Sequence, residues 1–291
     1  MKNLFGVIDV GSNSVRLMVT DGKSLNDKIS VTTRLAEGFD KGLLSENSIR
    51  RTAEAVAFLN QTAKVRGVKG VYAFATAAVR NAENKNVFLD AVKKLCDLNI
   101  EVITGDEEAK LGRLGALGEK DGGLIDVGGA SSEITVVKGA KTVYSYSLNV
   151  GAVKIKDICG QDRQKAENYI AERIKEYGNV PKSEFTAIGG TATTVAAILQ
   201  SLKTYDAKMV QSYFVKVDDL SSLADRLYLT SVEDRKKIAG LQPQRAEIIA
   251  GGTLLLLRIL NTLGVNGYTA SERDNLEGYF TDRVINCEKK N

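Results

Sequence analysis

The sequence predicts an α/β protein built from two copies of one βββαβαβα unit. A seven-residue segment occurs twice, as IDVGSNS from Ile8 and as IDVGGAS from Ile125, with its aspartates 117 positions apart (126 − 9). Strand-like and helix-like stretches follow both copies in the same order. At 291 residues, the chain is also longer than one core of ordinary size requires. We therefore expect two duplicated domains.

The first copy begins with a predicted β-hairpin. Its repeated segment follows an apolar run and precedes the alternating run VRLMVT from Val15, which is typical of two strands joined by a tight glycine-containing turn. Apolar spacing then predicts, in order, a strand near 28–35, a helix over 46–66, a strand over 70–75, a helix over 84–98, a strand over 100–104 and a helix over 106–118. On the second helix, Phe88, Val92 and Leu95 are expected to share the packed face.

The second copy repeats this order with an insertion. Its hairpin continues into SEITVVK from Ser132. The elements expected after it are a strand over 141–148, a helix over 164–177, a strand over 185–188, helices over 191–202 and 246–263, a strand over 267–270 and a helix over 274–285. Residues 204–241 interrupt the pattern. We expect domains at 1–120 and 121–278, with the last helix, about 279–291, packing back on the first domain.

Composition narrows the chemistry. The chain has no histidine, which excludes serine–histidine nucleophiles, histidine-ligated metals and histidine bases. The net charge of +4 suits an anionic substrate, and no stripe of lysine and arginine is interleaved with aromatics, so DNA is not an expected partner. No apolar run reaches the ~18 residues that span a bilayer, and the three separated cysteines, Cys96, Cys159 and Cys287, are expected to be free thiols. We expect a cytoplasmic protein without membrane contact.

The two hairpin turns are the first candidate site. A single glycine–serine turn is ordinary, but two equivalent turns at the head of two equivalent units predict that both face one central cleft. Their backbone N–H groups can bind phosphate oxygens. The residues concerned are Gly11, Ser12, Asn13 and Ser14, and Gly128, Gly129, Ala130 and Ser131. Asp9 and Asp126 end the strands before the turns and can hold Mg²⁺ or another divalent cation; the alternative is that each caps its turn.

These motifs resemble the Ppx/GppA family of exopolyphosphatases and guanosine pentaphosphate phosphohydrolases, in a short two-domain form. The resemblance covers nearly the whole chain. It implies the actin, Hsp70 and sugar-kinase fold, with ribonuclease H-like halves. The matching stretches are IDVGSNSVRLMV from Ile8, ATAAVRNAEN from Ala75, VITGDEEAKL from Val102, LIDVGGASSEI from Leu124, LNVGAVKI from Leu148 and IGGTATTVA from Ile188.

The resemblance implies roles for individual residues. Glu108 matches the general base that activates water, whereas acids at a helix start would otherwise only complement the helix dipole. Arg16 and Arg80 match positions near the substrate; the alternative is a solvated surface charge. Glu133 is a candidate for positioning metal or water, or a strand-surface glutamate. Gly190 and Thr191, in GGTATT between a strand and a helix, are expected to point amides at phosphate, and Lys154 is a further candidate contact or a surface lysine.

Several positions depart from the family pattern. Ala130 stands where a third glycine is usual, and Thr193 where an arginine is common. GLQPQRAEII from Gly240 keeps the family's Arg245 and Glu247, but SERDNLEG lacks a glycine and an arginine before Glu277. These departures affect substrate preference more than chemistry.

The resulting hypothesis is hydrolysis of a phosphoanhydride. The substrate is inorganic polyphosphate, guanosine pentaphosphate (pppGpp) or both, with Glu108 activating water and Mg²⁺ assisting; the resemblance also suggests a homodimer. One alternative is an ATP-dependent kinase of the same fold, for which no convincing sugar-site aspartate is present. Another is a non-catalytic sensor of polyphosphate or alarmone, which would be expected to lack the base.

Overall fold

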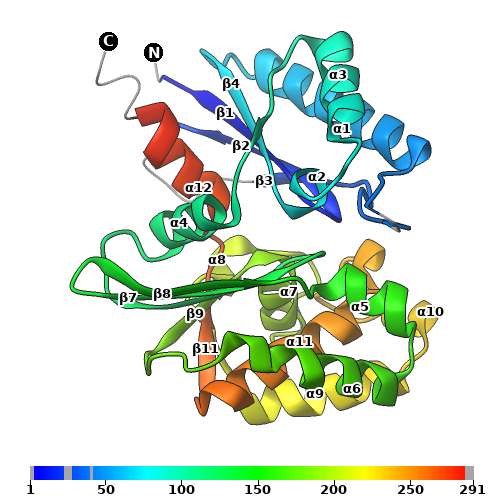
Figure 1. Ribbon diagram of the computed structural model, residues 1–291, viewed down its shortest axis with the longest axis vertical. Helices are drawn as coiled ribbons and strands as arrows, with labels where there is room; N and C mark the ends of the chain where they lie inside the picture. Colours follow the sequence, from blue (N-terminus) through cyan, green and yellow to red (C-terminus); the bar gives the residue numbers. More distant parts are fainter. Residues whose placement is uncertain (1–2, 23–27, 40–41, 286–291) are drawn as a thin grey trace. The chain divides into compact units, whose positions relative to one another are not determined.

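The computed structural model describes residues 3–22, 28–39 and 42–285, which form two compact units (Figure 1). Unit 1 comprises the residues up to Gly115 together with those from Asn275 on, and unit 2 comprises Ala116–Asp274. Cys287 and the end of the helix expected over 279–291 lie outside the described residues. That each unit is an independent domain, with a cleft between the two, stays a prediction.

Unit 1 contains a five-stranded sheet in the order β3-β2-β1-β4-β5. Its strands are β1 (Phe5–Val10), β2 (Ser14–Thr20), β3 (Lys28–Thr32), β4 (Val71–Ala75) and β5 (Glu101–Val102). Its helices are α1 (Glu46–Val65), α2 (Ala77–Arg80), α3 (Lys85–Cys96), α4 (Gly105–Ala116) and α12 (Asn275–Tyr279), which continues as a π-helix over Phe280–Ile285. β1 pairs antiparallel with β2 and parallel with β4.

The two faces of the first sheet are covered by different helices. Figure 1 shows α1 and α3 on one face and α4 and α12 on the other. Because side chains alternate along a strand, Gly6 faces Ala63 of α1, while Phe5 and Val7 join the core beneath α4 and α12. Asp9, two residues beyond Val7, therefore lies on the face of α4. This alternation places the Asp9 side chain on the same side of the sheet as α4, the helix that carries Glu108.

Unit 2 contains a six-stranded sheet in the order β10-β11-β9-β6-β7-β8. Its strands are β6 (Gly122–Val127), β7 (Ser132–Lys138), β8 (Lys141–Leu148), β9 (Phe185–Ile188), β10 (Phe214–Lys216) and β11 (Gly267–Ala270). Its helices are α5 (Ala152–Cys159), α6 (Arg163–Arg173), α7 (Gly189–Leu199), α8 (Ala207–Val210), α9 (Val217–Leu229), α10 (Val232–Arg235) and α11 (Ile249–Leu263), with 3₁₀ turns at Ile174–Tyr177 and Pro243–Arg245. α11 is the central core helix: Leu254, Leu255 and Leu256 are all fully buried.

Strand register shows the duplication directly. Asp9 pairs with Arg16 across β1 and β2, and Asp126 pairs with Glu133 across β6 and β7, so the 117-residue offset holds on both strands. Read from β8, the second sheet has the order of the first with β10 added at its edge. The predicted duplicated α/β fold is confirmed, and the expected insertion over 204–241 supplies the added strand.

Some expected elements differ from the structure. The helix α5 was not predicted, β5 is shorter than the strand expected over 100–104, and α7 begins at Gly189 instead of Thr191. The expected packing of Leu95 was wrong, since this side chain is 55% exposed, whereas Phe88 and Val92 are fully buried. None of the described helices combines the length and apolar character needed to cross a lipid bilayer.

Candidate functional site

Asp9 and Arg16 form the first part of a polar cluster in unit 1. They face each other across β1 and β2, and Arg16 Nε donates to Asp9 Oδ2 at 3.2 Å. Arg16 Nη2 contacts the same oxygen. Asp9 is almost fully buried, so the buried carboxylate is balanced by the guanidinium. Two predicted residues, one assigned to metal and one to phosphate, are thus brought together as an ion pair.

Glu108 enters the same region from the first turn of α4. A capping box begins this helix: Thr104 Oγ1 accepts from the Glu107 N–H at 3.2 Å, and Glu107 Oε2 accepts from the Thr104 N–H at 2.9 Å. Glu107 therefore caps the helix, and the side chain of the next residue, Glu108, points inward and is only 7% exposed. Arg80 Nη1 donates to Glu108 Oε2 at 2.8 Å and to the Ile103 carbonyl at 3.1 Å.

The surroundings of Glu108 set its proton affinity. Burial raises the pKa of its carboxyl, and the negative charge of Asp9 adds to this rise. The Arg80 guanidinium and a hydrogen bond from Thr76 act in the opposite direction, and the net direction is upward. A carboxylate with a raised pKa takes a proton from water more readily than an exposed one, which suits a general base.

The turn after β1 is fastened by its carbonyl groups. Gly11 N–H donates to the Ser14 carbonyl at 3.0 Å, the Asn13 carbonyl accepts from the N–H groups of residues 33 and 34, and the Ser12 carbonyl accepts from that of residue 36. Within the described part of the chain, the Ser12 and Asn13 N–H groups make no hydrogen bond. Two consecutive donors therefore remain for an anion, whereas the N–H of Gly11, also predicted to bind phosphate, closes the turn.

The turn after β6 has the same construction. Gly128 N–H donates to the Ser131 carbonyl at 3.0 Å, while the first turn of α5 caps the carbonyls of Gly128 and Gly129 at 2.9 Å each. A Cβ on Gly151 would lie 2.5 Å from the Gly129 carbonyl, so the close approach requires glycine. Among the described residues, the N–H groups of Gly129 and Ala130 form no hydrogen bond. Ala130 thus presents its amide despite lacking the usual glycine.

Asp126 and Glu133 lie side by side on β6 and β7. Ser147 Oγ, on the next strand, donates to Glu133 Oε1 at 2.6 Å. Asp126 Oδ1 packs against Gly189, where a Cβ would overlap it. Gly189 has φ +82°, a conformation that favours glycine. It is also the first residue of α7, so the expectation that GGTATT lies between strand and helix was wrong: it forms the first turns of the helix.

The beginning of α7 is covered by Arg245, which the sequence reasoning left without a role. Its guanidinium lies over Gly190 so closely that a Cβ there would overlap it. Thr191 is buried against Gly252 of α11, and Thr193 Oγ1 donates to the Gly189 carbonyl at 3.1 Å. The N–H groups of a helix's first turn have no partner within the helix, so they remain available to an anion beside Arg245.

Lys154 lies on the first turn of α5, beside the second glycine turn. Its Nζ donates to Asn149 Oδ1 at 2.8 Å, and burial lowers the pKa of its ammonium group. Its backbone N–H donates to the Gly129 carbonyl at 3.2 Å. The backbone of Lys154 therefore helps to fix the glycine turn after β6, independently of any phosphate contact made by its side chain.

The carboxylates of the two units differ in how well they suit Mg²⁺. Within residues 3–22, 28–39 and 42–285, no three histidine, cysteine, aspartate or glutamate side chains are grouped to hold a metal ion. Mg²⁺ commonly takes one or two protein carboxylates and completes its shell with water and substrate phosphate. Asp126 and Glu133 offer such a pair of oxygen donors, whereas Asp9 is engaged by Arg16. The second unit fits the ion better than the first.

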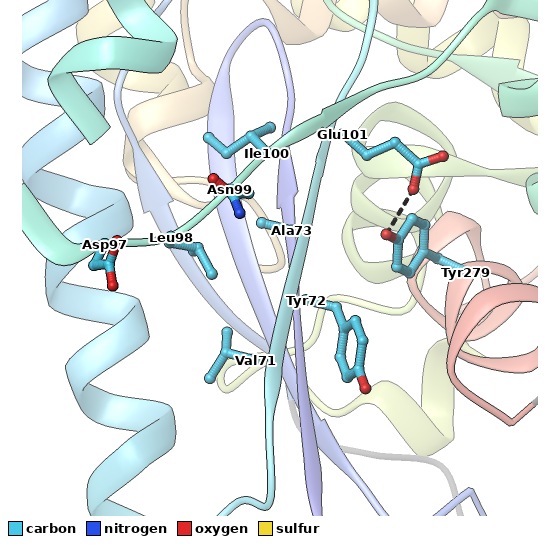
Figure 2. A pocket seen from close by; sticks show the side chains of 9 residues that line it. All are labelled: Val71, Tyr72, Ala73, Asp97, Leu98, Asn99, Ile100, Glu101 and Tyr279. Carbon is cyan, nitrogen blue, oxygen red and sulfur yellow. Dashed lines mark hydrogen bonds between the residues drawn. The ribbon is translucent and has the colours of Figure 1, made fainter. Parts of the chain in front are cut away.

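A pocket of about 480 Å³ lies elsewhere in unit 1 (Figure 2). It is formed by the beginning of β4, the segment 97–101 and Tyr279, whose hydroxyl donates to Glu101 Oε2 at 2.8 Å. None of the predicted site residues lines it. Because β4 runs from Val71 to Ala75, the pocket lies at the opposite end of this strand from Thr76. Its two carboxylates are paired with cations, Asp97 with Lys93 and Glu101 with Arg283.

Three relatives align with almost the whole chain. A bifunctional 3-dehydroquinate synthase/phosphatase from Fusobacterium nucleatum is 28% identical over 96% of the chain and 46% of its own length. Exopolyphosphatase 2 from Mycobacterium tuberculosis is 30% identical over 93% of the chain and 95% of its own length. A guanosine-5′-triphosphate,3′-diphosphate pyrophosphatase from Vibrio campbellii is 28% identical over 97% of the chain and 59% of its own length. The chain thus spans less than two thirds of the first and third relatives.

Solved structures share the fold. The Ppx-GppA enzyme of Aquifex aeolicus superposes with a TM-score of 0.77 at 27% identity, covering 96% of this chain and 99% of that one. The model of the Ppx/GppA phosphatase family matches residues 14–286, which is nearly the entire sequence. With the mycobacterial relative aligned over nearly its full length, this match establishes that the chain belongs to the Ppx/GppA phosphatase family.

Proposed function

We propose that this protein hydrolyses a terminal phosphoanhydride bond, releasing orthophosphate from inorganic polyphosphate or the 5′ γ-phosphate from pppGpp. The names of the mycobacterial and Vibrio relatives support these two substrates. The observation that carries the proposal is Glu108, a buried carboxylate of raised pKa held by Arg80 in the cluster that contains Asp9.

In the proposed reaction, Glu108 takes a proton from water as the water oxygen bonds to the terminal phosphorus. The bridging P–O bond breaks, and its electron pair leaves with the shortened chain or nucleotide. The N–H groups of the two glycine turns and of Gly190 and Thr191 would bind phosphate oxygens. Arg16, Arg80 and Arg245 would offset the negative charge. Phosphoryl transfer depends mainly on such positioning and charge compensation.

Arg80 has two proposed functions. Its pairing lowers the pKa of Glu108 and so favours the charged form of the carboxylate. A guanidinium has five N–H donors and can bind a phosphate while keeping one bond to the glutamate. When Arg80 also binds the substrate, its ion pair with Glu108 would weaken. The Glu108 carboxylate would then be more basic at the moment when the water is positioned.

A divalent cation would assist from unit 2. Asp126 and Glu133 would hold Mg²⁺ together with phosphate oxygens of the substrate, and the ion would supply charge neutralisation there. The two carboxylates face each other across adjacent strands, where like charges repel. A bound cation would offset this repulsion.

Orthophosphate release with Mg²⁺ tests the proposal against its alternatives. The wild-type protein is incubated with polyphosphate, with pppGpp and with ATP in the presence and absence of sugars. Release from polyphosphate or pppGpp supports hydrolysis, and comparing the two substrates decides the preference. Turnover of ATP only with a sugar would indicate a kinase. Tight binding of polyphosphate or pppGpp without any release would indicate a sensor and refute the proposed chemistry.

A further inference from the structure

Arg235 is a buried cation that the proposed chemistry does not use. It belongs to α10 and is 1% exposed. Its guanidinium makes hydrogen bonds to three neutral oxygens: Nε donates to the Leu227 carbonyl at 2.7 Å, and Nη1 donates to Gln161 Oε1 at 2.5 Å and to the Ala246 carbonyl at 3.1 Å. Burying a charge against neutral acceptors is costly, and burial lowers the pKa of this group. The three hydrogen bonds offset part of this cost, and two of their acceptors, Gln161 and the Ala246 carbonyl, adjoin the segment that carries Arg245.

One hydrogen bond of Arg235 and one of Gln161 end on the segment that carries Arg245. Arg235 holds the Ala246 carbonyl, and Gln161 Nε2 donates to the Glu247 carbonyl at 3.0 Å. Gln161 therefore links the buried guanidinium to the next peptide. The 3₁₀ turn before these residues and the start of α11 after them add local hydrogen bonds: the Ala246 and Ile248 N–H groups donate to the carbonyls of residues 243 and 245.

The fixed segment aims Arg245 at the beginning of α7. Its guanidinium overlies Gly190, and its Nε donates to Gln242 Oε1 at 3.1 Å. A long arginine side chain can adopt many rotamers, and a fixed backbone removes one source of this freedom. Arg235 and Gln161 thus fix the backbone beside Arg245, from which its side chain extends toward Gly190. Their own hydrogen bonds are to other residues than Gly190.

We propose that Arg235 and Gln161 are positioning residues that hold the backbone of residues 246 and 247, so that Arg245 presents its guanidinium to a phosphate oxygen at the start of α7. The inference rests on the proposed function, because it gives Arg245 a substrate. A merely space-filling role would not require arginine, since an apolar side chain of similar volume is often tolerated in place of a buried charge. Lysine would be a poor replacement, because its donors all lie on one nitrogen, whereas Arg235 reaches its acceptors from the separate nitrogens Nε and Nη1 of a planar guanidinium.

Gln161→Leu is the principal test, because Gln161 is exposed and its loss should leave the fold intact. Gln164→Leu is the matched control: this exposed glutamine lies on α6, and its side chain donates to Asn168 on the same helix. Binding of tripolyphosphate is measured by calorimetry, and amide exchange of residues 242–248 by mass spectrometry. Arg235→Met is a second variant, with its fold checked by circular dichroism.

Gln161→Leu should weaken tripolyphosphate binding about tenfold, the size of coupling within one hydrogen-bond network. Amide exchange over 242–248 should rise, and Gln164→Leu should change neither quantity. In an Arg245→Ala background, Gln161→Leu should cause no further loss of binding. Equal loss with and without Arg245, unchanged binding and exchange, or no tripolyphosphate binding by the wild type would each overturn the inference. Binding without hydrolysis by the wild type would instead refute the proposed function and leave this test intact.

Discussion

At the scale of single residues, the two acids Glu107 and Glu108 have separate tasks. Glu107 completes the capping box with Thr104, and Glu108 points inward to Arg80. Helix geometry explains the division, because consecutive residues project about 100° apart and cannot share one environment. The pair therefore allows the proposed base to be changed without loss of the helix cap.

Opposite shifts of the pH–rate profile are expected from the two charges around Glu108. Arg80 lowers the pKa of Glu108 and Asp9 raises it. Activity requires the carboxylate form, so Arg80→Met should move the acidic limb of the kcat/KM profile to higher pH. Asp9→Asn should move it to lower pH. Shifts in the same direction for both variants would show that this limb does not report Glu108.

Stability should respond to Glu108 with a definite sign. Its folded pKa lies above the ordinary value of 4.5, so the folded protein binds more protons than the unfolded chain as pH rises through this window. The free energy of unfolding therefore falls with rising pH. Glu108→Gln should be more stable than wild type at pH 8 and nearly equal to it below pH 4.5. Urea unfolding at both pH values measures this difference, and an equal difference at both would contradict the assignment.

At the scale of elements, the glycine turn after β6 is held by α5, a helix that was not predicted from the sequence. Gly151 has φ −145°, which any residue can adopt, so glycine is required here only by the close approach to Gly129. Gly151→Ala should cost about 1–3 kcal/mol of stability, as overpacking does, and weaken phosphate binding by displacing the turn. Thermal unfolding and tripolyphosphate binding measure these effects. Gly70→Ala is the control, since its Cβ would meet only Tyr72 at an ordinary 3.5 Å.

The success of prediction varies among elements for physical reasons. The strands β8, β9 and β11 have the predicted bounds because each is a short apolar or alternating run with clear turn signals. The helix α5 was missed because it is only eight residues long and follows a glycine, although Ala152, Val153, Ile155 and Cys159 are buried at helical spacing. Leu95 was misplaced because apolar spacing does not reveal which flank of a helix its neighbour leaves uncovered.

The site was predicted in parts. The glycine turns were found because they repeat, and Glu108 was assigned by family resemblance. The Arg80–Glu108 ion pair joins residues 28 positions apart, and the position of Arg245 over Gly190 joins residues from distant elements. Local sequence patterns contain no signal for such partners, so only the fold could bring them to light.

At the scale of the whole molecule, the duplicated units have diverged at one cross-strand pair. Asp9 faces Arg16 in unit 1, and the equivalent Asp126 faces Glu133 in unit 2. The first pair is balanced by its own charges, while the second is suited to an added cation. The duplication thus supplies two turns of similar construction whose neighbouring cross-strand pairs differ in charge.

The Mg²⁺ dependence of activity should reflect this difference between the Asp9–Arg16 and Asp126–Glu133 pairs. Glu133→Gln should raise the Mg²⁺ concentration for half-maximal activity by about tenfold or more, since even outer-shell changes weaken metal binding by about that factor. Arg16→Gln, at the equivalent position of unit 1, should leave this concentration within about twofold. Mg²⁺ titration of orthophosphate release measures both. An equal effect of the two variants would place the metal elsewhere.

The most direct measurement is the rate of orthophosphate release by Glu108→Gln and by Asp106→Asn, an exposed acid two residues earlier on the same helix. Glu108→Gln should remain folded and bind tripolyphosphate but lose about 10²- to 10⁴-fold in kcat, the usual contribution of a general base. Asp106→Asn should stay close to wild type. A Glu108→Gln protein with the wild-type rate would contradict the account.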